Sequence, residues 1–159
     1  MDILNKLKER WQGIDYPFLV HSNGKLRFSE IAEQDSVDLS DVHSGDVVAL
    51  IGDFDPKSIL TLLQLIDKNV ILVPLTVDTR GQHNYFFESA LVDVVIEGDT
   101  VKRIIHNKKH DFIEKLRSQN HAGLVLFSTG TTGQPKAILH DLTLFMQRFE
   151  TPRPTLKTI

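Results

Sequence analysis

The stretch that decides the fold reads DVVALIGDFDPKSILTLLQLIDKNVILVPL and runs from residue 46 to residue 75. It contains two short apolar runs, Val47–Ile51 and Val70–Pro74, that are typical of buried strands. Between them, Asp55-Pro56 provides the residues expected at the N-cap and first position of a helix. Apolar residues then recur at helical spacing until Lys68-Asn69, which is expected to end the helix. The stretch therefore predicts a strand, a helix and a second strand in succession.

The same alternation continues on both sides of this unit. Its rhythm predicts one α/β domain over residues 1–159, with a largely parallel sheet flanked by helices. Further helices are predicted at Asp2–Trp11, Tyr85–Leu91, Asp111–Ser118 and Leu142–Phe149, strands at Val92–Glu97, Val101–Ile105 and Gly123–Phe127, a hairpin that turns at Asn23-Gly24, and a short helix capped by Ser29.

Composition and charge exclude several classes of protein. With 41% hydrophobic and 25% charged residues, the 159-residue chain has ordinary globular usage. Lys and Arg number 18 against 21 Asp and Glu, and this net charge of −3 gives no reason to expect nucleic-acid binding. The absence of cysteine excludes disulfides, cysteine-based zinc sites and thiol catalysis. The longest apolar run, Val70–Leu75, is too short to span a bilayer, and no signal peptide is evident. We therefore expect a cytoplasmic protein that does not enter a membrane.

Two groups of ionisable residues permit more than one interpretation. His106 and His110 are four residues apart near acidic neighbours, which is compatible with a metal site, but the segment is better interpreted as a polar loop that opens a helix. Asp53 and Asp55 follow a predicted strand and could serve acid–base chemistry. The simpler interpretation of Asp55, directly before Pro56, is a helix N-cap.

The segment that carries the chemistry reads Ser128-Thr129-Gly130-Thr131-Thr132-Gly133-Gln134-Pro135-Lys136. Its two glycines allow a tight turn and a close approach to a ligand, and successive backbone N–H groups can form an anion-binding nest. The hydroxyl groups can contact phosphate oxygens or Mg²⁺, and the lysine adds a positive charge. The segment is not a Walker A loop, which would require Gly-Lys-Ser/Thr where Pro135-Lys136-Ala137 stands. It predicts a phosphate-binding loop, and a surface loop without a ligand is the alternative.

This segment resembles the signature S/T-S/T-G-T-T-G-x-P-K-G of the adenylate-forming superfamily, which includes acyl-CoA synthetases and the adenylation domains of peptide synthetases. Other stretches agree in order along the chain. Residues 26–31 (LRFSEI) resemble the T-Y-x-E-L stretch of that superfamily, residues 44–50 (SGDVVAL) its P-G-D-R-V-A-L, and residues 66–75 (IDKNVILVPL) its K-A-G-A-x-x-V-P-L. The resemblance covers nearly the whole chain, but only the N-terminal part of an enzyme of that superfamily.

The resemblance implies an ATP-dependent ligase, of the acyl-CoA synthetase type, that activates a carboxylic acid as an acyl-adenylate. The acyl group then passes to a thiol acceptor, either coenzyme A or a carrier pantetheine. By this resemblance, the loop binds the β- and γ-phosphates of ATP. Its phosphate-binding residues are Ser128, Thr129, Gly130, Thr131, Thr132, Gly133 and Lys136.

The rest of the machinery is expected downstream of residue 159: the acidic Mg²⁺ motif, the ribose-binding aspartate and the catalytic lysine. The chain is therefore expected to be the N-terminal portion of a longer AMP-binding domain, with no metal ligands of its own and no activity when isolated. Because a sheet that lacks its remaining strands exposes an edge, we also expect the isolated chain to self-associate.

Three departures from the family pattern keep other functions open. Ala137 and Asn69 stand where the family has glycine, and His140 is displaced from the common position of a family histidine, so its role is not assigned. One alternative is a non-catalytic nucleotide-binding or protein-interaction module, and another is a structural copy whose loop binds nothing. The intact Lys136 and both loop glycines favour the ligase over the last of these.

Overall fold

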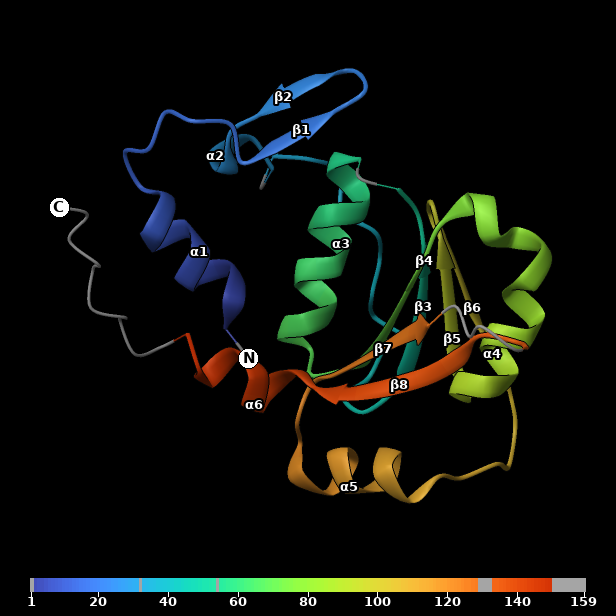
Figure 1. The fold of residues 1–159 in the computed structure, drawn as a ribbon. Coiled ribbons are helices and arrows are strands. Elements are labelled where there is room, and N and C mark those ends of the chain that lie inside the picture. The colour runs from blue at the N-terminus through green and yellow to red at the C-terminus, as the bar shows by residue number, and fades with distance from the viewer. Residues whose placement is uncertain (1, 32, 54, 129–132, 150–159) are drawn as a thin grey trace, which may run out of the picture.

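A computed structural model describes residues 2–31, 33–53, 55–128 and 133–149 of the chain. Its centre is a six-stranded sheet whose four inner strands are parallel and whose two outer strands are antiparallel to their neighbours (Figure 1). The predicted largely parallel α/β sheet is therefore confirmed. In spatial order the strands are β6 (Thr100–Arg103), β5 (Val94–Glu97), β3 (Val47–Ile51), β4 (Ile71–Leu75), β7 (Gly123–Ser128) and β8 (Lys136–Asp141).

The unit formed by β3, α3 and β4 agrees closely with its prediction. Helix α3 spans Pro56–Asp67, and the Asp55 carboxylate accepts a hydrogen bond of 3.0 Å from the backbone N–H of Ser58, which makes Asp55 the N-cap. Burial raises the pKa of Asp55, but hydrogen bonds from the hydroxyl and backbone N–H of Ser58 outweigh it and leave that pKa below its usual value. Asn69 follows the helix with φ of 55°, a left-handed conformation that Asn tolerates.

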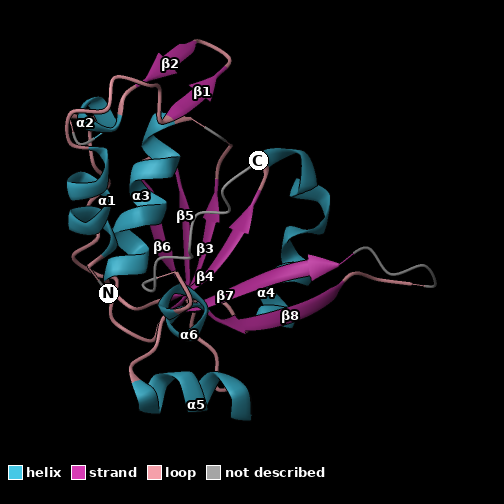
Figure 2. Cartoon of the chain, turned by 60° about the vertical axis from the view of Figure 1, so that its left-hand side comes forward, coloured by secondary structure: helices cyan, strands magenta, loops and turns pink. Residues whose placement is uncertain are grey.

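Helices cover both faces of the sheet (Figure 2). On one face, α1 (Ile3–Trp11) and α3 pack against a cluster that contains Val48 and Leu50 of β3. On the other face, α4 (His83–Ala90) and α5 (Asp111–Gln119) pack against Val47, Ala49 and Ile51 of the same strand. Because both of its faces are covered, every residue of β3 is buried, which explains its uninterrupted apolar sequence.

The remaining elements are short. A separate hairpin joins β1 (Leu19–His21) to β2 (Gly24–Leu26), next to α2 (Phe28–Ile31). A 3₁₀ helix, η1 (Val77–Gln82), leads into α4, and α6 (Leu142–Gln147) follows β8. The predicted cap at Ser29 is wrong: the helix already begins at Phe28, and the backbone N–H of Arg27 donates to the carboxylate of Glu30 at 2.6 Å. Within the described ranges, no helix is long and apolar enough to cross a membrane.

Arginine side chains hold the amino-terminal end of the sheet together. The Arg117 guanidinium of α5 donates to the Asp93 carboxylate at 2.7 Å and to the carbonyl oxygen of Gly45 at 2.9 Å. The Arg103 guanidinium of β6 donates to Asp46, just before β3, at 2.8 and 3.2 Å. These two arginines therefore tie α5 and β6 to the start of the central strand.

Candidate functional site

The loop singled out by the sequence lies at the tip of a β-hairpin. Strands β7 and β8 pair antiparallel over six residue pairs, from Gly123 opposite Asp141 to Ser128 opposite Lys136. Strand β8 was not predicted from the sequence, and it places the two ends of the loop directly opposite each other. Four of the predicted phosphate-binding residues, Thr129, Gly130, Thr131 and Thr132, lie outside the described residues.

The hairpin departs from the rest of the sheet towards its tip. β7 pairs with β4 over only two residue pairs, Ile71 with Gly123 and Leu72 with Leu124. Beyond these pairs β7 diverges from β4, so that the carboxyl end of β7 and the amino end of β8 lie away from β4 (Figure 2). The loop nevertheless begins at the carboxyl end of a parallel strand, which is where open α/β sheets commonly bind ligands.

The described residues at the loop's ends are suited to contact an anion. Ser128 is half-buried at the end of β7, and Lys136 is exposed at the start of β8. Within the described part of the chain, the Lys136 side chain has no carboxylate within salt-bridge distance. Gly133 is exposed, and a Cβ atom built there would meet nothing within 4 Å. The Lys136 charge and the surface at Gly133 are thus accessible to a ligand.

Two consecutive residues of α4 contact the two legs of the loop. The Tyr85 hydroxyl donates a hydrogen bond of 2.7 Å to the carbonyl oxygen of Pro135, directly before Lys136. The Phe86 ring packs on the ring of Phe127, directly before Ser128, with 4.2 Å between centroids. Sequence analysis missed both contacts, because the partners are 50 and 41 positions apart and no local pattern links them.

The carboxyl ends of β3 and β4 also form a cavity. The cavity, lined by Gly52, Asp53, Ser58 and Thr76 among others, has a volume of about 130 Å³. The Asp55 carboxylate beside it is engaged by Ser58, which confirms the N-cap interpretation over acid–base chemistry.

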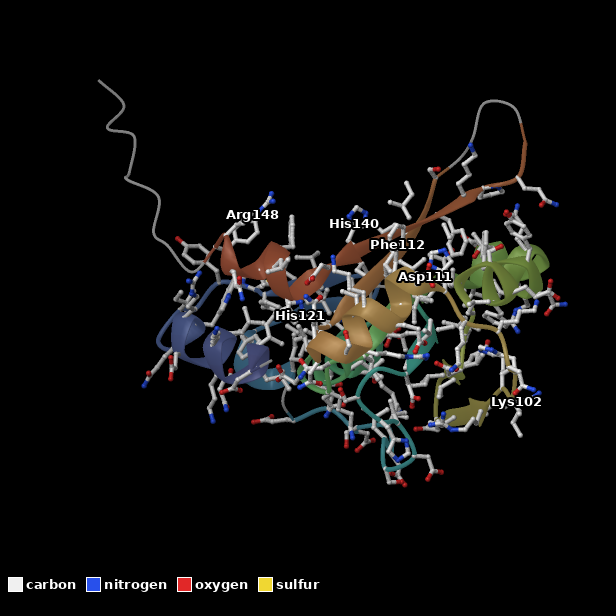
Figure 3. All side chains as sticks on the ribbon, turned by 90° about the horizontal axis from the view of Figure 1, so that it is seen from below. Lys102, Asp111, Phe112, His121, His140 and Arg148 are labelled. Atoms are coloured by element: carbon white, nitrogen blue, oxygen red, sulfur yellow. The ribbon has the colours of Figure 1, made fainter. Side chains whose placement is uncertain are left out.

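The histidines considered as metal ligands take separate structural positions. His106 lies with Nε2 3.2 Å from the Leu91 carbonyl oxygen, while the Nδ1 atom of His110 accepts from the backbone N–H of Phe112 at the start of α5. The interpretation of His110 as part of a loop that opens a helix is confirmed. No group of three or more His, Asp or Glu side chains suited to hold a metal occurs among the described residues. His140 is exposed on β8 and points away from α5 (Figure 3).

Comparison with known proteins identifies the fold. The sequence matches no protein-family model and no curated protein sequence. The structure of the Klebsiella oxytoca NpsA N-terminal subdomain in complex with anthranilyl-AMSN matches with a TM-score of 0.64 and 21% identity, over 99% of this chain and 44% of that one. NpsA-ThdA, an artificially fused adenylation–PCP di-domain from the same organism, matches with a TM-score of 0.64 and 19% identity, over 99% of this chain and 35% of that one.

A second protein shares the architecture. VinN in complex with L-aspartate matches with a TM-score of 0.59 and 16% identity, over 89% of this chain and 47% of that one. In each of these comparisons the chain spans less than half of the length of the solved structure. The chain therefore has the fold found in the N-terminal subdomain of an adenylation domain.

Proposed function

We propose that this chain is the N-terminal part of an ATP-dependent ligase that converts a carboxylic acid to an acyl-adenylate. The observation that carries the proposal is the coincidence of two independent features. The sequence from Ser128 to Lys136 resembles the adenylate-forming signature, and it lies on a fold similar to that of the NpsA N-terminal subdomain. NpsA was solved with anthranilyl-AMSN and VinN with L-aspartate, which supports a small organic acid as the substrate class.

The residues at the described ends of the loop fit a magnesium-bound phosphate group. The Ser128 hydroxyl is an oxygen donor of the kind that Mg²⁺ and phosphate both accept, and Lys136 is a compact cation at the opposite end of the loop. When bound, Mg²⁺ neutralises the charge of the phosphates and assists the departure of pyrophosphate. This chain's own contribution is to bind and orient the β- and γ-phosphates, with Thr131 and Thr132 as further hydroxyl contacts.

The proposed acyl acceptor is a thiol, either coenzyme A or a carrier pantetheine. The carrier gains support from the NpsA-ThdA di-domain, in which an adenylation domain is fused to a PCP. Coenzyme A would make the parent enzyme an acyl-CoA synthetase. We also propose that the chain alone does not complete the reaction, since it spans 44% of the matched NpsA subdomain.

Calorimetric titration of the chain with Mg-ATP tests this function, with Lys136→Ala as the variant. Because Lys136 is exposed and has no carboxylate partner among the described residues, the substitution should leave the fold intact and weaken binding about tenfold or more. Lys102→Ala, which removes an exposed lysine from β6 at the opposite edge of the sheet, is the matched control and should bind as the parent does. Equal affinity of the parent and Lys136→Ala would contradict a phosphate-binding loop and favour a non-catalytic module.

A pyrophosphate-release assay on the same samples tests the second part of the proposal. The isolated chain should release no pyrophosphate with ATP and any of a panel of organic acids. Release by the parent chain that Lys136→Ala abolishes would show that the chain is catalytically complete.

A further inference from the structure

We propose that α4 fixes the two described ends of the loop, at Phe127 and at Pro135, and that Tyr85 is the positioning residue for the second of these ends. The inference deepens the proposed function and rests on it for the consequence for ATP. Its structural basis is independent of any ligand, because it lies in contacts among described residues on either side of the loop tip.

The first leg is held by packing. Phe86 is 4% exposed and belongs to the core cluster on the α4 face of the sheet. Its ring lies 4.2 Å from that of Phe127, with 33° between the ring planes. Since Phe127 directly precedes Ser128, this aromatic contact fixes the point at which the chain leaves the sheet.

The second leg is held by one directional hydrogen bond just before it enters the β7–β8 ladder at Lys136. Pro135 has no backbone N–H, so its carbonyl oxygen is the backbone hydrogen-bonding group that it offers. The Tyr85 hydroxyl donates to that oxygen at 2.7 Å. The Pro135 carbonyl and the Lys136 N–H belong to the same planar peptide unit. The hydrogen bond therefore orients the peptide from which the Lys136 side chain departs.

Helix α4 is itself fixed to the end of β4. His83 is 5% exposed, and its Nε2 atom lies 3.0 Å from the carbonyl oxygen of Thr76, the residue after β4, and 3.1 Å from the Thr79 hydroxyl. Strands β4 and β7 pair directly over only two residue pairs, at their amino ends. At their carboxyl ends, α4 takes over as the connection between β4 and the loop.

This arrangement predicts a specific role for the Tyr85 hydroxyl. A phosphate loop that is already oriented loses less conformational freedom when it binds, and so binds more tightly. Without the hydroxyl, the Pro135 carbonyl loses the contact that orients it just before the ladder begins at Lys136, whereas the ring of residue 85 can still pack against Phe86. The loss should fall on the affinity for the phosphates and not on the stability of the domain.

The test compares Tyr85→Phe with Tyr16→Phe, which removes the hydroxyl of a tyrosine that is 77% exposed. The ¹⁵N order parameters of Gln134 and Lys136 should fall in Tyr85→Phe, while that of His140, further along β8, stays unchanged. The affinity for Mg-ATP should fall about two- to tenfold, which is the range for one neutral hydrogen bond. Tyr16→Phe should match the parent in both measurements, and the midpoint of thermal unfolding should change little in either variant.

The outcomes separate this inference from the proposed function. Unchanged order parameters at Gln134 and Lys136 in Tyr85→Phe would overturn the positioning role. So would an unchanged affinity in Tyr85→Phe alongside a weakened one in Lys136→Ala. If the order parameters fall but neither the parent nor any variant binds Mg-ATP, the positioning role is supported and the proposed ATP site fails. If the order parameter of His140 falls as well in Tyr85→Phe, the hairpin is loosened as a whole, and this result would also overturn the positioning role of Tyr85.

Discussion

Asp46 shows how individual charges stabilise the amino end of the central strand. Its carboxylate accepts hydrogen bonds from the Arg103 guanidinium at 2.8 Å and from the backbone N–H of His43 at 2.8 Å. Burial of Asp46 raises its pKa, but the hydrogen bond and charge of Arg103 and the His43 N–H together lower the pKa below its ordinary value. The same contact raises the pKa of Arg103, so the pair remains charged in the folded state.

Asp46→Asn should make stability less dependent on acid pH. The pKa of Asp46 is lower in the folded state than in the unfolded state. Its charged carboxylate therefore stabilises the fold fully above the unfolded pKa of about 3.9, and this stabilisation is lost as pH falls through the folded pKa. Above about pH 5, the free energy of unfolding of the parent should exceed that of the variant by about 1 to 2 kcal/mol. This difference is small because Arg103 is partly exposed to solvent, which screens the interaction. Urea unfolding between pH 2 and pH 7 measures the difference. A gap that stays constant down to pH 2 would contradict the charged interaction.

Single residues also show where sequence-based prediction ends. Asp55 could be assigned as an N-cap because its partner, Ser58, is three residues away and the pattern is local. Tyr85 could not be linked to the loop, because the contact crosses 50 positions and depends on how α4 packs against the sheet. The sequence therefore locates the loop, whose phosphate-binding residues stay a prediction, but it does not reveal the contacts of the loop's ends with α4.

At the scale of elements, the end of α3 depends on a backbone conformation. Asn69 takes φ of 55° at the turn into β4, where the adenylate-forming family has glycine. Glycine adopts this conformation without strain, Asn tolerates it, and a residue such as Ala pays about 1 kcal/mol for it. The departure from the family pattern at this position is thus conservative in conformational terms.

Asn69→Ala should have a free energy of unfolding about 1 kcal/mol lower than that of Asn69→Gly, because both variants lack the Asn side chain and differ in the cost of the left-handed backbone. Equilibrium unfolding in guanidinium chloride, followed by circular dichroism, measures both variants. The same pair of substitutions at Asn120, which has φ of 53° after α5, provides an internal comparison. Equal stability of the Ala and Gly variants at both positions would contradict the argument.

Elements differ in how strongly the sequence specifies them. The strand at Val47–Ile51 was predicted with the same bounds, because both of its faces are buried and the apolar run is continuous. The strand at Lys136–Asp141 was missed: it has no buried residue, and its exposure alternates only between exposed and half-buried over its last four residues. Its extended conformation comes from pairing with β7. The short sequence of this strand mixes polar and apolar residues and does not reveal that pairing.

The whole molecule presents an edge at β8. Among the described residues, β8 pairs only with β7, so its outer backbone groups have no partner strand. Leu126 and Ile138 face each other across this pair, and each is 44% exposed. An edge strand beside exposed apolar side chains is a template for association between chains.

We expect the isolated chain to self-associate through this edge at high concentration. Light scattering over a concentration series should show a rising mass for the parent and a smaller rise for Ile138→Lys, which places a charge on the exposed strand. Ile105→Lys, at a residue that is 93% exposed and lies away from β8, is the control and should behave as the parent does. A parent that remains monomeric throughout the series would contradict the expectation.

The strand order has a consequence for how the chain is made. β4 joins one side of β3, β5 joins the other side, β6 adds outside β5, and β7 and β8 then add outside β4. Each strand, as it leaves the ribosome, therefore meets an edge that already exists, and none has to insert between two strands that are already paired. The sheet can grow outward from β3 in the order of synthesis, and among the described strands the hairpin that carries the loop is added after the others.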